Sequence, residues 1–268
     1  MELSNGGLER LSYKEIKAYV DNLNVIKERS NLHYLINKLS EDNRKNVKSL
    51  GERLFKKKQK IENEIKRVKA MYNFDKGFGS YGCVAGVDEV GRGPLAGPIV
   101  ACTVILDLNV IDEEIILWLN DSKKISPKKR KELSEVIKKK ALAYYIAESS
   151  SEEIDEKGIS YCNNKVFIEA CNYISIKPEI VLSDGYSIKG ISIENKAVIK
   201  GDTKSASIAA ASILAKEYRD SLMEDYSKEY IHYAFEKNAG YGTNEHIEGL
   251  KEFGTCKIHR KSFLKNII

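Results

Sequence analysis

Two adjacent acids interrupt an apolar stretch of this chain, and that stretch constrains the fold more than any other segment. It reads CVAGVDEVGRGPLAGPIVA and runs from Cys83 to Ala101. Its two apolar halves are typical of short buried strands, and the glycines between them favour a tight bend. A buried strand needs neighbouring strands and covering helices, so the chain must enclose a sizeable core. Hydrophobic residues make up 42% of the 268 residues, which is enough for such a core.

The acid pair, Asp88 and Glu89, is difficult to place on an ideal strand. Consecutive side chains of a regular strand point to opposite faces of the sheet, so the two acids cannot serve one site from it. A strand that ends or bulges at the pair can aim both acids the same way. The alternative is that one acid caps a turn and the other faces solvent.

Residues 81–268 alternate strand-like and helix-like segments, which predicts an α/β domain with a central mixed sheet flanked by helices. The expected strands cover residues 82–90, 98–106, 142–150 and 179–185, and the expected helices cover residues 126–141, 163–175 and 205–230.

Residues 1–80 have a different pattern, because their apolar residues recur only at helical spacing. Ser12 and Glu15 match a capping box at the start of the first helix. We therefore expect an all-helical N-terminal extension, in which Gly51 interrupts a third helix. A linker with glycines at 77, 79 and 82 is expected to follow.

The extension also contains a basic run. Between Arg44 and Lys69 there are eleven Lys or Arg residues and three Glu residues. Such a run forms either a solvated helix face or a surface for nucleic acid, since Lys and Arg displace counterions from phosphate.

Several classes of protein are disfavoured by composition. Five cysteines without a CxxC pair favour free thiols in a reducing cytosol over a disulfide framework or a zinc site. The opening residues, MELSNGGLERLSYKEIK, have no apolar signal segment, and no apolar run is long enough to cross a bilayer. We expect a soluble cytoplasmic protein that does not contact membranes.

Further carboxylates point to a metal site. Asp184 ends the apolar strand EIVLSDG, and α/β proteins commonly build sites at strand ends. Glu217 and Asp220 share one face of the long helix, and spacing does not choose between them. Several carboxylates in one cleft repel each other unless a cation binds, and Mg²⁺ or Mn²⁺ takes oxygen ligands. Two ions about 4 Å apart stabilise the attacking and leaving oxygens of a phosphate displacement.

A dinucleotide-binding loop is the competing interpretation of GRGPLAG. Its glycines at 91, 93 and 97 miss the GxGxxG spacing by one residue, and Pro94 removes a backbone donor. Two acids just before the loop would repel a pyrophosphate. A small-molecule dehydrogenase is therefore the weaker hypothesis.

The block GVDEVGRGPLAGPIVA resembles the signature of the ribonuclease HII family. Similar blocks follow in the family's order: NDSKKISPKKR, EID, LSDG, KGDTKSASIAAASILAKEYRDSLM, NAGYGTNEH and HRKSF. The blocks cover roughly residues 82–263, so the resemblance extends over the whole α/β part of the chain.

The resemblance implies an RNase H-like fold and a metal-dependent endonuclease. Such an enzyme cleaves the RNA strand of RNA–DNA hybrids and incises 5′ to a ribonucleotide embedded in duplex DNA, leaving 5′-phosphate and 3′-hydroxyl ends. It also implies that Asp88, Glu89, Asp184 and Asp220 hold two Mg²⁺ or Mn²⁺ ions, which settles the choice against Glu217. The resemblance does not make Asp202 a ligand.

The resemblance further implies that the turn of Gly91, Arg92 and Gly93 reads the substrate together with Tyr241. Only RNA has the 2′-hydroxyl, and glycines let backbone groups approach it without a Cβ in the way. Lys123 and Lys204 lie in similar blocks, where they either hold backbone phosphates or are solvated.

Two other functions stay open. A ribonuclease HIII-like nuclease would cleave hybrids without junction preference, although that family lacks the arginine-centred turn. A nucleic-acid-binding protein with structural acids would not cleave at all. The helical extension is the departure from a minimal ribonuclease HII, and a monomer is the expectation for the family.

Overall fold

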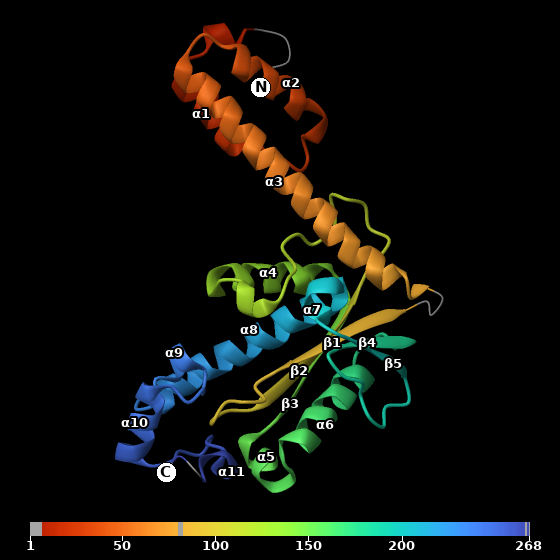
Figure 1. Ribbon diagram of the computed structural model, residues 1–268, viewed down its shortest axis with the longest axis vertical. Helices are drawn as coiled ribbons and strands as arrows, with labels where there is room; N and C mark the ends of the chain where they lie inside the picture. The colour runs from red at the N-terminus through yellow and green to blue at the C-terminus, as the bar shows by residue number, and fades with distance from the viewer. Residues whose placement is uncertain (1–6, 80–82, 266, 268) are drawn as a thin grey trace. The chain divides into compact units, whose positions relative to one another are not determined.

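The computed structural model describes residues 7–79, 83–265 and 267 (Figure 1). The chain divides into two compact units. The first consists of Met1–Lys69 and Val110–Leu117, and the second of Ala70–Asn109 and Trp118–Ile268. Gly82, the last glycine of the predicted linker, lies outside the described residues.

The first unit is built from helices, as its apolar spacing predicts. They are η1 (Leu8–Arg10), α1 (Tyr13–Asn22), α2 (Arg29–Glu41) and the part of α3 (Lys45–Lys76) up to Lys69. The predicted capping box begins α1, since Ser12 N donates to Glu15 Oε2 at 2.8 Å and Glu15 N donates back to Ser12 Oγ at 3.4 Å. The described residues of this unit contain no strand, which confirms the all-helical prediction.

The expected interruption at Gly51 is wrong, because α3 continues through it without a break. A Cβ at Gly51 would lie 3.0 Å from Leu39 Cβ and 3.2 Å from Ser40 Oγ. The glycine therefore allows α3 to pack closely against α2. Burial of the apolar side of α3 outweighs the roughly 1 kcal/mol that a glycine costs in a helix.

The second unit contains the predicted mixed sheet. Its strands are β1 (Val84–Val90), β2 (Ile99–Leu106), β3 (Ala141–Ser149), β4 (Ile180–Asp184) and β5 (Glu194–Val198), in the order β3-β2-β1-β4-β5. The β1–β2 and β2–β3 pairs are antiparallel, whereas β1–β4 and β4–β5 are parallel. The sequence did not predict β5, because its residues ENKAV are polar and mostly exposed at the edge of the sheet.

Helices cover both faces of the sheet (Figure 1). Ala85 and Val87 of β1 point to the face of α6 (Ile159–Asn172), where they pack with Phe167. Val84 points to the other face, where it packs with Ile208 of α8 (Ala206–Glu229). The alternation follows from the two-residue period of a strand.

The remaining helices are short, apart from α4. They are η3 (Ser122–Lys124), α4 (Pro127–Lys140), α5 (Ser151–Lys157), α7 (Gly201–Lys204), α9 (Phe235–Asn238), α10 (Asn244–Phe253) and α11 (Lys261–Leu264). No helix among the described residues combines the length and apolar character that a membrane span needs.

Candidate active site

The acids at the strand ends come together because β1 and β4 are parallel neighbours. Their carboxyl ends therefore lie at the same edge of the sheet. Asp88, Glu89 and Asp184 line one cavity of about 420 Å³ there, which we call the acid cavity. Three of the four acids predicted from the sequence thus share one site.

The structure resolves how Asp88 and Glu89 both reach the acid cavity. The ladder with β2 stays regular at the pair, with Asp88 opposite Cys102 and Glu89 opposite Ala101, so there is no bulge. The ladder with β4, in contrast, stops at Val87. Both acids lie beyond that point on β1, so the cavity at this end of the sheet reaches side chains of either face.

Asp88 is only 7% exposed. Burial raises its pKa well above the usual range, and the nearby carboxylates of Glu89 and Asp184 raise it further. A hydrogen bond with Ser212 of α8 acts in the opposite direction. The three carboxylates are therefore close enough to repel one another, and a cation between them would relieve that repulsion.

Glu89 lies on the α6 side of the sheet, where a tyrosine hydroxyl holds it. Tyr186 Oη donates to Glu89 Oε1 at 2.8 Å and accepts from Asn163 Nδ2 at 2.7 Å. Arg92 Nη1 lies 3.6 Å from the same Glu89 oxygen and 3.2 Å from Tyr186 Oη. Burial and the Glu89 charge raise the pKa of Tyr186, so its hydroxyl keeps its proton and acts as a donor.

Two further acids, Asp121 and Asp202, also line the acid cavity. Burial raises the pKa of Asp202, and the charges of Asp184 and Asp121 add to that effect. Asp184 Oδ1 accepts a hydrogen bond from Gly201 N at 2.6 Å, which joins β4 to the start of α7. Neither acid was predicted to lie at this cavity, although each lies in a block that resembles the family, NDSKK or KGDTK.

Asp220 does not line the acid cavity. It lines an adjoining cavity of about 590 Å³, which we call the second cavity. Ser212 lines the acid cavity, and Asp220 follows it eight residues later on α8, about 12 Å further along the helix axis. The sequence predicts that Asp220 shares a metal site with the other three acids, whereas in the structure it lines the adjoining cavity.

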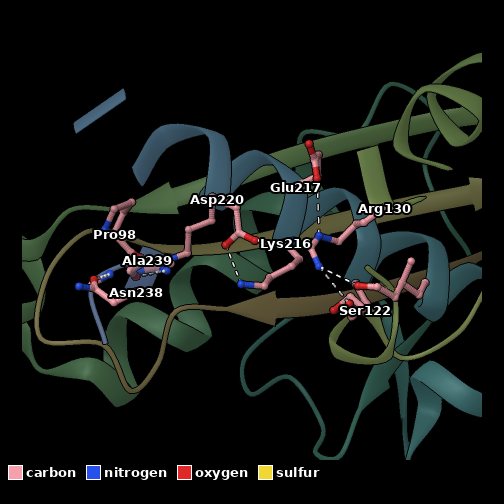
Figure 2. Close-up of polar contacts among 12 residues, drawn as sticks. Pro98, Ser122, Arg130, Lys216, Glu217, Asp220, Asn238 and Ala239 are labelled. Carbon is pink, nitrogen blue, oxygen red and sulfur yellow. Dashed lines mark hydrogen bonds and ion pairs between the residues drawn. The ribbon is translucent and has the colours of Figure 1, made fainter. Parts of the chain in front are cut away.

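Both oxygens of Asp220 are bound by cations. Arg130 Nη2 donates to Oδ2 at 2.7 Å, and Lys216 Nζ donates to Oδ1 at 2.6 Å (Figure 2). Glu217, the alternative from spacing, lies with its Oε2 3.6 Å from Arg130 Nε.

The acid cavity suits hard divalent cations, because the acids that line it offer only oxygen atoms as metal ligands. Within residues 7–79, 83–265 and 267, no three His, Cys, Asp or Glu side chains converge closely enough to hold an ion as they stand. One oxygen of Glu89 accepts a hydrogen bond from Tyr186, and one oxygen of Asp184 accepts a hydrogen bond from Gly201 N.

Two buried arginines shape the turn that contains Gly91, Arg92 and Gly93. Arg260 donates to Gly91 O at 2.6 Å, Arg92 O at 3.1 Å and Gly97 O at 2.9 Å. Arg219 donates to Pro98 O at 2.9 Å and to Ala96 O at 3.0 Å. Gly91 has a φ of 95°, and a Cβ there would lie 2.4 Å from Arg219 Nε. Only glycine combines that backbone with so close an approach.

Tyr241 lies beside this turn, 42% exposed, and lines both cavities. A Cβ on Gly93 would lie 3.9 Å from Tyr241 Cε1. Lys123 also lines both cavities, whereas Lys204 is exposed and lines neither. The structure thus brings Lys123 to the predicted site and leaves Lys204 outside it.

A pair of buried histidines is hydrogen-bonded to the backbone of Tyr241. Cys256 N donates to His259 Nδ1 at 2.9 Å, so the proton of that ring lies on Nε2. His259 Nε2 lies 2.9 Å from His246 Nε2, and His246 Nδ1 lies 2.9 Å from Tyr241 O. Proton donation must run from His259 to His246 to the Tyr241 carbonyl, which requires both rings to be neutral.

Comparison with known proteins identifies the relatives of this chain. The sequence model of the family "Ribonuclease HII" matches residues 85–266, and that of the "Ribonuclease HII N-terminal domain" matches residues 12–79. The chain is 62% identical over 266 residues to the ribonuclease HII of Clostridium beijerinckii, covering 98% of each chain. It is 61% identical over 255 residues to that of Clostridium perfringens strain 13, covering 95% of this chain and 91% of the relative.

A solved structure agrees on the fold. The ribonuclease H2 of Pyrococcus horikoshii superposes with a TM-score of 0.59 at 28% identity, over 67% of this chain and 93% of its own. The mixed five-stranded sheet between α6 and α8 is thus an RNase H-like fold, as the sequence resemblance implies. The chain therefore belongs to the ribonuclease HII family, whose members are divalent-metal-dependent endonucleases acting on RNA–DNA hybrids.

Proposed function

We propose that this protein incises the RNA strand 5′ to a ribonucleotide, both in hybrids and at single ribonucleotides in duplex DNA, at the acid cavity. The observation that carries this proposal is the convergence of Asp88, Glu89 and Asp184 at the carboxyl ends of two parallel strands. Their mutual repulsion supports cation binding, because burial and neighbouring charge both raise the pKa of Asp88.

Asp88, Glu89 and Asp184 would hold two Mg²⁺ or Mn²⁺ ions. When bound, such ions activate a water and stabilise the charge on the attacking and leaving oxygens. Asp202 is the fourth acid that the geometry favours, because it lines the same cavity and its pKa responds to the Asp184 charge. Asp220, the fourth ligand predicted from the sequence, is less favoured since two cations already bind it.

Substrate selection would depend on the turn at Gly91, Arg92 and Gly93 together with Tyr241. The turn is rigid because the buried Arg260 binds the carbonyls of Gly91 and Arg92, and Gly93 lies against the Tyr241 ring. A rigid glycine turn suits a hydrogen bond to a 2′-hydroxyl, which only RNA offers. The half-exposed tyrosine ring is placed to stack on the neighbouring sugar.

The decisive experiment uses a duplex with one embedded ribonucleotide, incubated with Mg²⁺, Mn²⁺ or EDTA. We expect a single cut that leaves 3′-hydroxyl and 5′-phosphate ends with either ion, and none with EDTA. Cleavage of a four-ribonucleotide tract without cleavage of the single ribonucleotide would instead favour a ribonuclease HIII-like activity. Binding without cleavage under all conditions would contradict the nuclease proposal.

Replacing Tyr241 tests the junction role directly. We expect Tyr241→Ala to lower the cleavage rate at a single ribonucleotide at least about tenfold more than in a long hybrid, since one stacked ring contributes about 1–3 kcal/mol. Tyr161→Ala, at an exposed tyrosine on α6 outside both cavities, is the matched control. If Tyr241→Ala lowers the cleavage rate equally on the two substrates, Tyr241 does not sense the junction.

A further inference from the structure

We propose that Lys216 binds a backbone phosphate of the nucleic acid and that Asp220 is the residue that positions it. The proposal rests on the nuclease function proposed above and concerns the wall between the two cavities. Lys123, Lys216 and Tyr241 are the residues that line both.

The spacing along α8 puts Lys216 on this wall. Ser212, Lys216 and Asp220 follow each other at four-residue intervals, so they lie on one face of the helix, about 6 Å apart along its axis. Ser212 lines the acid cavity and Asp220 lines the second cavity, with Lys216 between them. A phosphate held by Lys216 would therefore lie next to the acids without contacting them.

The ammonium group of Lys216 has donors to spare. It has three N–H groups, and in the part of the chain that the structure describes it donates only to Asp220 Oδ1, at 2.6 Å. Its side chain is 17% exposed, so the group is held in place but reachable from the cavities. A fixed ammonium loses little rotamer entropy when a phosphate binds.

Asp220 holds more than Lys216, as Figure 2 shows. Its other oxygen accepts from Arg130 Nη2 at 2.7 Å, and Arg130 Nη1 donates to Ser122 O and to Ile125 O, both at 3.3 Å. These two carbonyls belong to the first residue and the C-cap of the 3₁₀ turn η3, which contains Lys123. One carboxylate thus connects both lysines of the shared wall, which gives a role to a partly exposed acid that does not line the acid cavity.

The charges around the second cavity favour an anion. Six basic and four acidic side chains line it. Arg130 and Lys216 are paired with Asp220, but among the described residues Lys123, Lys128 and Lys131 have no acidic partner within 4.0 Å. A polyanionic backbone that crosses this surface would gain these unpaired cations as contacts.

The test compares Lys216→Met and Asp220→Asn with the wild-type protein on a fluorescent RNA–DNA hybrid. Binding is measured by anisotropy in EDTA at several salt concentrations, and cleavage is measured over an Mg²⁺ titration. Asp225→Asn and Lys228→Met are matched controls, because they form an exposed ion pair of 2.7 Å on the same helix outside both cavities.

We expect Lys216→Met to raise the Kd about tenfold and to lower the slope of log Kd against log salt by about 0.9, the value for one lost phosphate contact. Asp220→Asn should raise the Kd roughly threefold or more, since it frees the Lys216 side chain without removing it. Asp220→Glu should restore most of the lost affinity. The Mg²⁺ concentration for half-maximal cleavage should stay within about twofold in both variants.

Other outcomes would overturn the proposal. If Lys216→Met and Lys228→Met have the same Kd and the same salt slope, Lys216 makes no phosphate contact. An Asp220→Asn protein with unchanged Kd but a large rise in its Mg²⁺ requirement would make Asp220 a metal ligand instead. If Asp220→Asn does not fold, Lys216→Met still decides the contact, because it keeps the Asp220–Arg130 pair. A wild-type protein that binds but never cleaves would refute the nuclease function and leave the Kd comparison intact.

Discussion

Asp88 shows at the residue scale how the site opposes stability. It is buried, and the Glu89 and Asp184 charges add to the effect of burial in raising its pKa. A carboxyl whose pKa is raised on folding makes the folded state bind more protons than the unfolded state. Its contribution to stability is therefore lost as pH rises through the folded pKa. Repulsion among the ionised carboxylates destabilises the folded state, and a bound cation would offset that repulsion.

Replacing Asp88 with Asn should separate catalysis from folding. We expect cleavage to fall by about a thousandfold or more, because Asp88 is a proposed ligand to the ions, while hybrid binding in EDTA changes less than about twofold. In the absence of divalent ions, the thermal midpoint at pH 7 should rise, since the repulsion disappears. Asp225→Asn controls for the loss of one surface charge. Normal turnover by Asp88→Asn would exclude Asp88 from the mechanism.

At the element scale, α3 and α8 meet through one buried carboxylate within the second unit. Asp75, in the last turn of α3, accepts a hydrogen bond from Ser207 N at 2.9 Å, at the start of α8. An acid at a helix N-terminus gains from the free N–H groups there. Burial nevertheless dominates and raises the pKa of Asp75 to about 6, against the hydrogen bonds from residues 205–207 that lower it.

This contact predicts a pH dependence for Asp75. The folded state retains the proton up to about pH 6, whereas the unfolded state releases it near pH 3.9. Asp75 therefore lowers the unfolding free energy by roughly 3 kcal/mol in total across this range, about 2 kcal/mol of it as pH rises from 4 to 6. We expect Asp75→Asn to remove that fall in urea unfolding and to be at least as stable at pH 7. Parallel curves for both proteins would contradict the assignment.

The His246–His259 pair connects α10 to the segment before α11 and depends on pH in the opposite sense. Burial and, to a smaller extent, the neighbouring His246 lower the pKa of His259 to about 4. The unfolded state takes up protons first as pH falls below about 6.5, so stability is complete above that pH and falls toward pH 4. We expect His259→Gln to be less stable at pH 7 but to change less between pH 6.5 and 4.5. A steeper change in the variant would refute the neutral pair.

At the scale of the whole molecule, the excess of positive charge is concentrated in particular places. The formal net charge is only +5, yet the exposed side of α3 contains Lys48, Lys56 and Lys66. At 100° per residue these lysines lie within 80° of one another and opposite the buried Leu54 and Val68. None of the three forms an ion pair within 4.0 Å in the described part of the chain.

Neutralising this face tests the nucleic-acid interpretation of the basic run. We expect the Lys48→Gln, Lys56→Gln and Lys66→Gln triple variant to lower the salt slope of hybrid binding by about one or more, with the thermal midpoint unchanged. A triple variant at Lys38, Lys228 and Lys251 removes equal charge elsewhere and serves as control. An unchanged slope would make the α3 face a solvated surface.

Local patterns were predicted well, and distances along elements were not. The Ser12 capping box and the run of small residues in α8 predicted real helices, because each signal is contained in a short segment of the chain. Strand β5 and the continuity of α3 at Gly51 were missed, since an edge position and a close helix contact leave no local signal. The acids at 88, 89 and 184 were found from strand ends, whereas Asp202 was not, because nothing near it in the sequence shows which cavity it faces.

The sequence by itself determined the family, the mixed sheet and the helical extension, because periodicity and ordered motifs act over short segments. Only the tertiary structure decided which acids share a cavity. That outcome depends on the parallel pairing of β1 with β4 and on a rise of 1.5 Å per residue along α8, which separates Asp220 from Ser212 by about 12 Å. Chain order shows neither which strands pair nor which part of a helix lies beside their ends, because both depend on contacts between residues far apart in the chain.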